Sequence, residues 1–294
     1  MSLTFHIIGA GRVGQTLGHL WQQSGLLQLS HIVRRCNLEA APWTHRFTTA
    51  KIVTQISNLP AADVVLISTP DDAIESSAEA LAACAWLSPQ TLVCHCSGAK
   101  SRSALASLAA KGVQTASLHP VFAFADVDAS IRTLAGHLVA IEAEPAQQAF
   151  MTQLAEALGL QPFYLDAAHK ARYHAALSIS ANFLVTLAGF AEDVLAPLGL
   201  PQSQSRALVS GLMQQSFHNY QALGPKAALT GPIVRGDAAT VASHLDALTP
   251  AETPLYQALG VATVGLAKAA LSPEQAQTLL DLLAPPQAQT KKKQ

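Results

Sequence analysis

Short apolar runs alternate with segments of helical spacing along the first half of the chain. Leu3–Ile8 is a run of large and β-branched residues, and Leu17, Leu20 and Trp21 follow it at helical spacing. Runs of the first kind predict strands, and spacing of the second kind predicts amphipathic helices. Further strands are predicted at Leu29–Val33, Asp63–Ser68, Thr91–Cys96, Val113–Leu118, Leu138–Glu142 and Pro162–Leu165, and helices at Ala73–Ala85, Ser101–Ala110 and Pro145–Leu158.

The order of these elements predicts the fold. Strand, helix and strand in repetition form right-handed crossovers, which give a parallel sheet with helices on both faces. The uninterrupted apolar run Val64–Ile67 is typical of a strand that is buried on both faces, as such a sheet requires. We therefore expect an α/β Rossmann domain, with a doubly wound and mostly parallel sheet, over residues 1–166.

The pattern changes after Asp166, where helical spacing continues without intervening strands. Gly199 ends the first of these helices, and Ser272 before Pro273 is a good cap for the last. The sequence predicts an all-α domain over residues 167–284 and a disordered tail over residues 285–294. The helices are expected at Ala167–Leu198, Gln202–Leu223, Ala238–Ala247, Ala251–Ala270 and Pro273–Leu283.

Composition limits the partners of this 294-residue chain. Its 18 basic and 19 acidic residues give a net charge of −1, so no global field attracts nucleic acid or anionic lipid. Only 13% of the residues are charged, which indicates apolar surface at an interface and favours a homodimer. We expect a small-molecule substrate and neither nucleic acid nor a membrane as partner.

Neither a signal peptide nor a membrane span is expected. The first apolar run lacks a basic segment before it, and Ala175–Phe190 is interrupted by serine, asparagine and threonine. The four cysteines form no secreted-type framework. Cys94-His95-Cys96 has no second ligand pair after it, so we expect no metal site. The predicted location is the cytoplasm.

A glycine-rich segment of the G-x-G-x-x-G type follows the first predicted strand and opens the first helix. In this context Gly9 allows a tight turn, Gly11 lets a pyrophosphate approach the backbone, and Gly14 lets the helix pack on the sheet. The N–H groups and dipole of the helix then favour the anion. The sequence predicts a dinucleotide site that includes Gly9, Gly11, Arg12, Val13 and Gly14.

The end of the second strand predicts which dinucleotide binds. NAD-binding domains usually place an acidic residue there, on the ribose 2′-hydroxyl group. This chain instead has Arg34 and Arg35, and no acidic residue before Glu39. Planar guanidinium groups suit a 2′-phosphate, so we expect NADP as the cofactor.

Two further strand ends are expected to line the same crevice. Ser68, Thr69 and Pro70 follow one parallel strand, and Ser97 and Gly98 follow the next. Loops at the carboxyl ends of such strands form the ligand crevice, so these residues are predicted to contact the cofactor. The acidic pair that comes directly after Pro70 is expected to contact the cofactor or to cap the next helix, with equal weight.

The chain resembles bacterial Rossmann-like proteins that carry a helical C-terminal domain of unknown function, numbered 2520. This group is similar to the reductases related to 6-phosphogluconate dehydrogenase, which include ketopantoate and pyrroline-5-carboxylate reductases. The resemblance implies a nicotinamide-binding domain, a helical second domain and frequent homodimers. The matching segments cover nearly the whole chain in order: the Gly9–Gly14 loop, Ser68–Pro70, His95–Ala99, Leu118–Pro120, Lys170–His174 and Leu229–Asp237.

Lys170 and His174 are candidate catalytic residues, because a spacing of four places both on one helix face. In the related hydroxyacid dehydrogenases a helix at this place carries a lysine and an asparagine with the same spacing; here the second position is His174. Either residue can supply the proton that a hydride reduction needs. The alternative is that Lys170 is solvated and that His174 only packs.

Two other residues are candidates for the substrate site. His119 follows a predicted strand and precedes a proline, an arrangement also found in prephenate dehydrogenases; the alternative is an ordinary turn. Arg235 lies in a break between helices, where it is predicted to bind a substrate carboxylate, from the same or a partner subunit. We expect the substrate pocket between the two domains, bounded by Ser97, Gly98, His119, Lys170 and His174.

The sequence favours an NADP-dependent oxidoreductase that acts on a small carbonyl or imine compound. Two alternatives stay open at this point. One is a non-catalytic NADP-binding sensor or interaction protein, because the usual asparagine is replaced by His174. The other is a dehydrogenase of the prephenate or arogenate type, which only His119-Pro120 suggests.

Overall fold

The computed structural model describes residues 2–34 and 44–284, in two compact units. The first unit ends at Asn182 and the second begins at Phe183. The sequence predicts this boundary after residue 166. In the structure, the segment from residue 167 to residue 182 instead belongs to the same unit as the sheet. Arg35, Cys36 and the predicted disordered tail lie outside the described residues.

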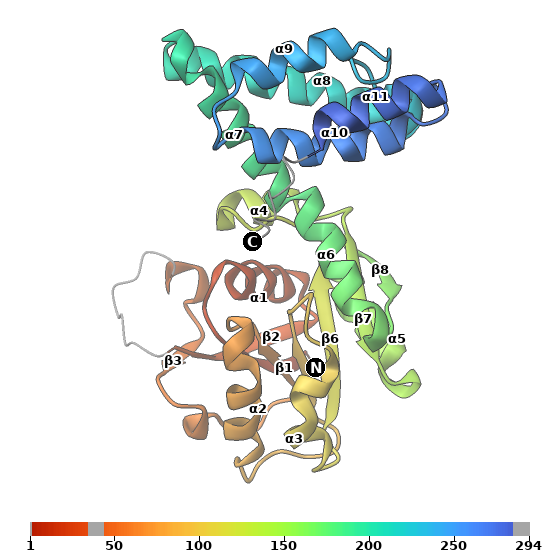
Figure 1. Ribbon diagram of the computed structural model, residues 1–294. Helices are drawn as coiled ribbons and strands as arrows, with labels where there is room; N and C mark the ends of the chain where they lie inside the picture. The colour runs from red at the N-terminus through yellow and green to blue at the C-terminus, as the bar shows by residue number, and fades with distance from the viewer. Residues whose placement is uncertain (1, 35–43, 285–294) are drawn as a thin grey trace, which may run out of the picture. The chain divides into compact units, whose positions relative to one another are not determined.

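The first unit is built on one sheet of eight strands, in the order β3-β2-β1-β4-β5-β6-β7-β8 within the described part of the chain. All neighbouring pairs are parallel except β6 and β7, which run antiparallel (Figure 1). The predicted α/β Rossmann class with a mostly parallel sheet is confirmed. The strands are β1 (Leu3–Ile8), β2 (Leu27–Val33), β3 (Lys51–Val53), β4 (Val64–Ile67), β5 (Leu92–His95), β6 (Gln114–Pro120), β7 (Leu138–Ala143) and β8 (Gln161–Tyr164).

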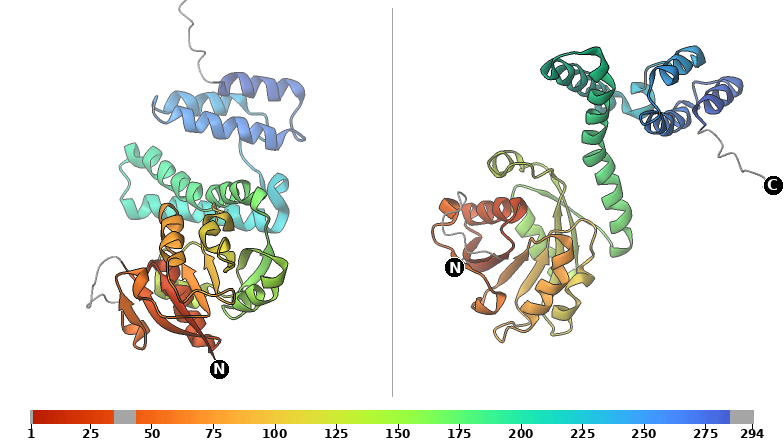
Figure 2. Two further views of the ribbon diagram at one scale, coloured as in Figure 1. Left: turned by 90° about the horizontal axis from the view of Figure 1, so that it is seen from below. Right: turned by 60° about the vertical axis from the view of Figure 1, so that its left-hand side comes forward.

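Successive residues of the central strands enter different cores. Ile7 packs in one hydrophobic core with helix residues such as Leu17, whereas its neighbour Ile8 packs in a second core with Ile74. Side chains alternate between the two faces of a strand, so helices cover both faces of the sheet (Figure 2). The helical elements of this unit are α1 (Arg12–Ser24), η1 (Thr44–Phe47), η2 (Ile56–Asn58), η3 (Asp71–Ala73), α2 (Ile74–Ala82), η4 (Arg102–Leu105), α3 (Ala106–Ala109), α4 (Val127–Thr133), α5 (Pro145–Glu156), η5 (Ala167–His169) and α6 (Lys170–Ser180).

The second unit is helical, as predicted. Its last helix begins with a capping box in which Ser272 and Gln275 bond each other's backbone N–H groups. Asp237 caps another helix by accepting a hydrogen bond from the backbone N–H of Thr240 at 3.0 Å. The elements are α7 (Asn182–Leu195), η6 (Ala196–Leu198), α8 (Gln202–Ala228), α9 (Ala238–Ala247), α10 (Thr253–Ala267) and α11 (Pro273–Leu283).

The single helix predicted over Ala167–Leu198 is divided in the structure. The backbone leaves regular helical geometry at Ala181, where φ is −113° and ψ is −65°, so α6 and α7 are separate helices. No glycine or proline marks this break, which is why the sequence pattern missed it. By length and composition alone the run Ala167–Leu198 could cross a membrane, and none of its most apolar window is buried within this chain.

Trp21 anchors α1 in the core. Its side chain is fully buried, stacks edge-on against Phe5, and donates a hydrogen bond from Nε1 to the Leu154 carbonyl oxygen at 2.8 Å. Leu154 lies on α5, so one side chain ties α1, β1 and α5 together.

Replacing Trp21 by alanine should lower the free energy of unfolding of the first unit by about 3–5 kcal/mol, because a large buried side chain is lost. Urea unfolding followed by circular dichroism measures this change. Trp86→Ala is the matched control, since Trp86 is only partly buried and should cost clearly less. Equal losses for both variants would show that Trp21 is not a core anchor.

Candidate functional site

The strand order brings two loops together at one edge of the sheet. β1 lies between β2 and β4, and the helices that follow β1 and β4 pack into the cores on opposite faces. In a doubly wound sheet this point of reversal, beyond the carboxyl ends of the strands, is where ligands bind. Residues 9–14 follow β1 and residues 68–70 follow β4, so both loops lie at that point.

Gly9 and Gly14 are required by the close approach of these loops. Gly9 has a φ of +99°, and a Cβ there would lie 2.8 Å from the backbone nitrogen of Thr69. A Cβ on Gly14 would collide with Ser68 Oγ and would lie 2.5 Å from the Gly9 carbonyl oxygen. Ser68 Oγ donates a hydrogen bond to that same oxygen at 2.7 Å. The two glycines and Ser68 therefore fix the shape of the loop.

Gly11 differs, because no protein contact requires a glycine there. Its φ of −74° and ψ of −178° are open to any residue, and a Cβ would meet no atom within 4 Å. Gly11 precedes the first turn of α1, which has no side-chain cap and no acidic residue. Free N–H groups at a helix N-terminus favour an anion. The approach of a phosphate to the backbone gives this glycine a physical reason.

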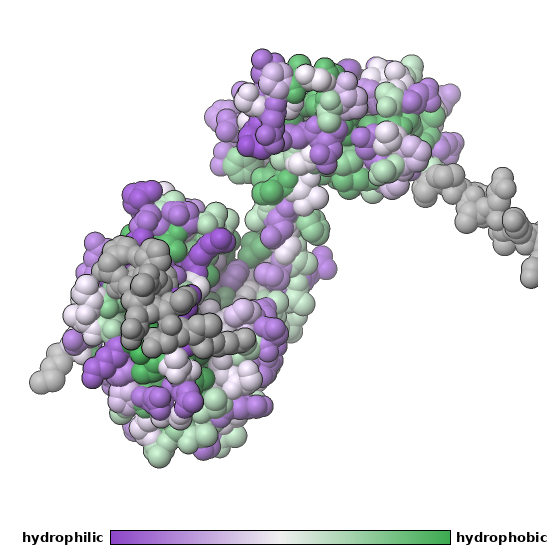
Figure 3. All heavy atoms as spheres, turned by 90° about the vertical axis from the view of Figure 1, so that its left-hand side faces the viewer, coloured by the Kyte–Doolittle hydropathy of each residue, from purple (hydrophilic) through white to green (hydrophobic). Residues whose placement is uncertain are grey.

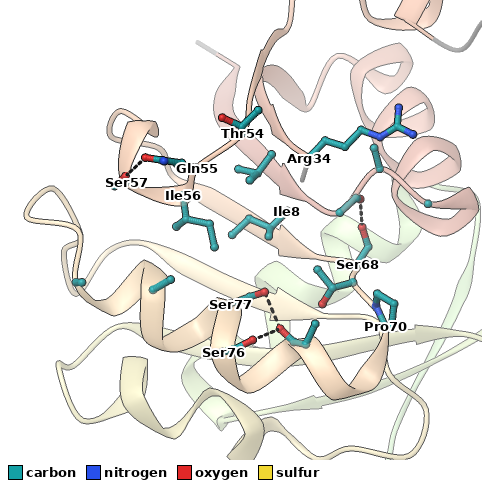
Figure 4. A pocket seen from close by; sticks show the side chains of 18 residues that line it. Ile8, Arg34, Thr54, Gln55, Ile56, Ser57, Ser68, Pro70, Ser76 and Ser77 are labelled. Atoms are coloured by element: carbon teal, nitrogen blue, oxygen red, sulfur yellow. Dashed lines mark hydrogen bonds between the residues drawn. The ribbon is translucent and has the colours of Figure 1, made fainter. Parts of the chain in front are cut away.

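A cavity of about 850 Å³ opens beside this loop. Arg34 and residues 54–57 line it on the side of β2 and β3, and Ser76 and Ser77 line it from α2 (Figure 4). Thr69 Oγ1 is buried there without a hydrogen-bond partner in the described part of the chain. A buried hydroxyl group without a partner is costly, so Thr69 offers a bond to a bound ligand. The size of this cavity, the basic side chain of Arg34 and the open position at Gly11 all suit a dinucleotide.

The other predicted cofactor residues lie as follows. Pro70 lines the cavity, Arg12 is exposed at the start of α1, and Val13 packs against the core. Arg35 lies outside the described residues. The cofactor roles of these residues stay predictions.

Ser97 is held in a polar network rather than left open. Its Oγ donates a hydrogen bond to Asp71 Oδ2 at 2.8 Å and accepts one from the backbone N–H of Lys100 at 2.9 Å. The expectation that the aspartates after Pro70 cap the next helix is wrong, because α2 begins at its Ala73 cap without any side-chain bond. Asp71 binds Ser97 because the carboxyl ends of the neighbouring strands β4 and β5 lie side by side.

His95 completes this network as a neutral imidazole. Its Nδ1 accepts a hydrogen bond from the Ser97 backbone N–H at 3.1 Å, so its proton is on Nε2, which donates to the Ser101 carbonyl oxygen at 3.0 Å. Burial lowers the pKa of His95 to about 4. Cys94 and Cys96, on either side, are free thiols, and burial raises the pKa of each.

Gly98, His119 and His174 come together as a second cluster. A Cβ on Gly98 would lie 2.7 Å from both His119 Nε2 and His174 Nδ1, so only glycine lets the two rings approach. The ring centroids are 6.0 Å apart. Burial, and then the neighbouring His174, lower the pKa of His119 to about 4. His119 is therefore neutral at neutral pH.

Lys170 is buried and bonded within the protein. Its Nζ donates to Ser117 Oγ at 2.5 Å and lies 3.4 Å from Glu142 Oε2. Burial lowers the pKa of Lys170, and the carboxylate of Glu142 opposes that shift. The alternative of a solvated lysine is therefore excluded in this structure. Ser117 and Glu142 face each other across β6 and β7, which is why both reach the same ammonium group.

The structure thus gathers Ser97, Gly98, His119, Lys170 and His174 within the first compact unit. Arg235 is exposed on the second unit, and its substrate role stays a prediction. Sequence reasoning missed Ser117, Glu142 and Tyr173. The first two carry no motif and become relevant only through strand pairing. Tyr173 lies between the two residues that the spacing singled out, and its hydroxyl group bonds His119.

Two family models match successive parts of the chain. Residues 1–120 match a Rossmann-like domain, and residues 137–263 match a domain of unknown function, DUF2520. The chain carries a Rossmann-like domain followed by a DUF2520 domain. This is the combination that the sequence motifs predict. None of the curated proteins matches this chain.

Solved structures share this two-part fold. A putative NADP oxidoreductase from Bacteroides fragilis superposes with a TM-score of 0.72 at 20% identity, over 88% of this chain and 96% of its own. A pyrroline carboxylate reductase from Plasmodium falciparum with NADP bound gives 0.60 at 11% identity, over 96% and 98%. An imine reductase from Myxococcus stipitatus in complex with NADP⁺ gives 0.57 at 14% identity, over 95% and 92%. At these identities the likeness concerns the fold.

Two glycine variants should separate ligand binding from folding. Gly11→Ala should leave the free energy of unfolding within about 0.5 kcal/mol and weaken dinucleotide binding at least about tenfold, because its Cβ enters only ligand space. Gly9→Ala should destabilise the protein, because its backbone conformation and Thr69 leave no room. Thermal unfolding and fluorescence titration with NADPH measure the two effects. Unchanged dinucleotide binding by the Gly11 variant would contradict the prediction that the pyrophosphate binds at this loop.

Proposed function

We propose that this chain is an NADP-dependent oxidoreductase that acts on a small imine or carbonyl compound. The observation that carries the proposal is the cavity at the reversal of strand order. It combines Gly11, which needs no glycine for the fold, with the unpartnered hydroxyl of Thr69 and with Arg34 at the end of β2. Each feature suits a different part of a dinucleotide. Gly11 suits the pyrophosphate, Thr69 suits a group that forms hydrogen bonds, and Arg34 suits the 2′-phosphate on the adenosine ribose.

Arg34 supports NADP rather than NAD. It follows β2, where an acidic residue would select the ribose 2′-hydroxyl group of NAD. Its backbone N–H bonds the Val53 carbonyl oxygen at 2.9 Å, so the residue is tied to β3 beside the cavity. A guanidinium group at this place suits a 2′-phosphate.

The low pKa of His119 favours an imine over a ketone as substrate. A bound nicotinamide cofactor supplies or accepts the hydride, and reduction of a ketone also needs a proton from an acidic group. His119 is neutral at neutral pH, because its pKa is about 4, and so it donates a hydrogen bond more readily than a proton. A protonated imine already carries the proton that its reduction requires. Lys170, bonded to Ser117 and Glu142, holds α6 against the sheet in this proposal.

A cofactor-oxidation screen tests the function. The purified protein is given NADPH with cyclic imines and with α-keto acids, and NADP⁺ with hydroxyl substrates of the prephenate type. We expect NADPH consumption with at least one imine. Tight NADPH binding without turnover in any class would favour the alternative of a non-catalytic sensor. Failure to bind NADPH would overturn the proposal.

Replacing Arg34 and Arg35 together by alanine should weaken NADPH binding about tenfold or more and leave NADH binding nearly unchanged. A charge-assisted contact to the 2′-phosphate contributes roughly 1.5–3 kcal/mol, and NADH has no such group. Fluorescence titration measures both affinities. Arg132→Ala, on α4, is the control and should change neither affinity. Equal weakening for both cofactors would contradict the assignment.

We also propose that the protein is a homodimer held by its second unit, and that it works in the cytoplasm. The second unit exposes hydrophobic surface (Figure 3). Apolar side chains line a groove of about 780 Å³ between α7, α8 and α9. A surface of this kind on a chain with few charges suits a second copy related by twofold symmetry. The exposed hydrophobic residues of the second unit include Phe183, Leu184, Val185, Leu208, Leu212, Phe217, Tyr220 and Leu223.

The cysteines support the proposed location in the cytoplasm. Cys84, Cys94 and Cys96 are free thiols, which suit a reducing compartment.

Sedimentation at micromolar concentration should show twice the chain mass of 30.8 kDa. Val185→Asp together with Leu212→Asp should shift the protein to the monomer, because a charge is costly in a buried apolar interface. Leu138→Asp is the control, since Leu138 is a half-exposed hydrophobic residue on the first unit. A starting protein that sediments as a monomer would exclude the dimer.

A further inference from the structure

Tyr173 is bonded directly to a candidate catalytic histidine. Its hydroxyl group lies 2.8 Å from His119 Nδ1, and the two ring planes meet at 89° with centroids 5.6 Å apart. Phe163 on β8 also packs against the tyrosine ring, with the ring centroids 6.1 Å apart. Two aromatic contacts therefore hold the tyrosine ring, and its hydroxyl group lies at one nitrogen of His119.

The direction of this hydrogen bond depends on which nitrogen of His119 carries the proton. Burial raises the pKa of Tyr173 to about 12, so the phenol keeps its proton at neutral pH. No other acceptor bonds that hydroxyl group in the described part of the chain. A neutral imidazole has one nitrogen without a proton, and when that nitrogen is Nδ1 the Tyr173 O–H donates to it. The proton of His119 is then on Nε2.

His119 Nε2 is the nitrogen that stays available. It has no hydrogen-bond partner among residues 2–34 and 44–284, and it lies over Gly98 beside His174 Nδ1, which is buried and also without a partner. The absence of a side chain at Gly98 lets both nitrogens reach the same place. One ring thus presents a fixed N–H donor, and the other a second polar atom beside it.

We propose that Tyr173 is a positioning residue that locks His119 as the Nε2–H tautomer, so that His119 and His174 together hold the reacting nitrogen or oxygen atom of the substrate. The part that concerns the substrate rests on the proposed function. The part that concerns the tautomer does not. Tyr173 acts through His119 and need not touch the substrate.

The surroundings of His119 define what its titration reports. His174 and Lys170 face it from α6, Asp71 from η3 and His95 from β5. The Tyr173 hydroxyl group can donate to the unprotonated Nδ1 of the neutral ring, and it can accept from the Nδ1–H of the imidazolium, so its removal takes a hydrogen bond from both protonation states. The position of the ring proton, rather than the pKa of His119, therefore distinguishes positioning from packing.

Nuclear magnetic resonance of the ¹⁵N-labelled histidine rings tests the tautomer without cofactor or substrate. The chain has 11 histidines, and His119→Gln identifies the signal of His119. We expect a protonated Nε2 and a hydrogen-bonded, unprotonated Nδ1 in the starting protein. Tyr173→Phe should remove the hydrogen-bond shift of Nδ1. A proton on Nδ1 in the starting protein would overturn the proposal, and this measurement needs no variant of Tyr173.

Kinetics test the role of the locked tautomer once a substrate is found. Tyr173→Phe should lower kcat about three- to tenfold, the value of one neutral hydrogen bond, with an unchanged Kd for NADPH. Tyr164→Phe is the control, because its hydroxyl group also bonds within the first unit, to Thr152 and Gln148, away from the histidines. An unchanged kcat for Tyr173→Phe would overturn the proposal. If the starting protein does not bind NADPH, that result would instead contradict the proposed function.

Discussion

The loops that follow the neighbouring strands β1 and β4 lie so close together that two positions between them have no room for a side chain. The rest of the site depends on this constraint. Gly9 and Gly14 have no room for a Cβ beside Ser68 and Thr69, and Ser68 Oγ closes the contact by its bond to Gly9. The loop therefore has one shape, which aims the first turn of α1 over the end of the sheet. The same constraint leaves Gly11 on the open side, where only a ligand would use its lack of a side chain.

Near this loop, the polar atoms that have no hydrogen-bond partner within the protein indicate where ligands can bind. Ser97, His95 and Lys170 are buried, and each has its hydrogen-bonding atoms engaged by a neighbouring element. Buried polar groups are stable only when bonded, so this network holds α6 against β6 and β7. Thr69 Oγ1 and His174 Nδ1 are among the buried side-chain atoms that have no hydrogen-bond partner in the described structure, and His119 Nε2 lies beside His174 Nδ1 at Gly98. These atoms are where a cofactor and a substrate can bind.

Local signals in the sequence were sufficient for most of the fold. Apolar runs located the central strands, and the glycine spacing located the loop, because both depend on near neighbours along the chain. β3 and α4 were missed because they are too short to show a period. The break at Ala181 was missed because neither glycine nor proline causes it.

Candidate site residues were predicted from two local signals. His119 and Gly98 were chosen because they follow predicted strands, and Lys170 and His174 because of their spacing on one helix. The contacts of Lys170 with Ser117 and Glu142 were not predicted, because they join residues far apart in sequence through the antiparallel pairing of β6 and β7. Asp71 was expected either to contact the cofactor or to cap the next helix, whereas in the structure it accepts a hydrogen bond from Ser97 at the end of the neighbouring strand. Pairing between strands, rather than local spacing, decided these cases.

The central claim is that the cavity beside Gly11 binds NADP(H). The most direct measurement is a crystal structure of the protein with NADP⁺ bound. We expect the pyrophosphate over Gly11 at the start of α1, a hydrogen bond to Thr69, and the 2′-phosphate beside Arg34. A dinucleotide bound elsewhere, or one whose 2′-phosphate faces solvent away from Arg34, would contradict it.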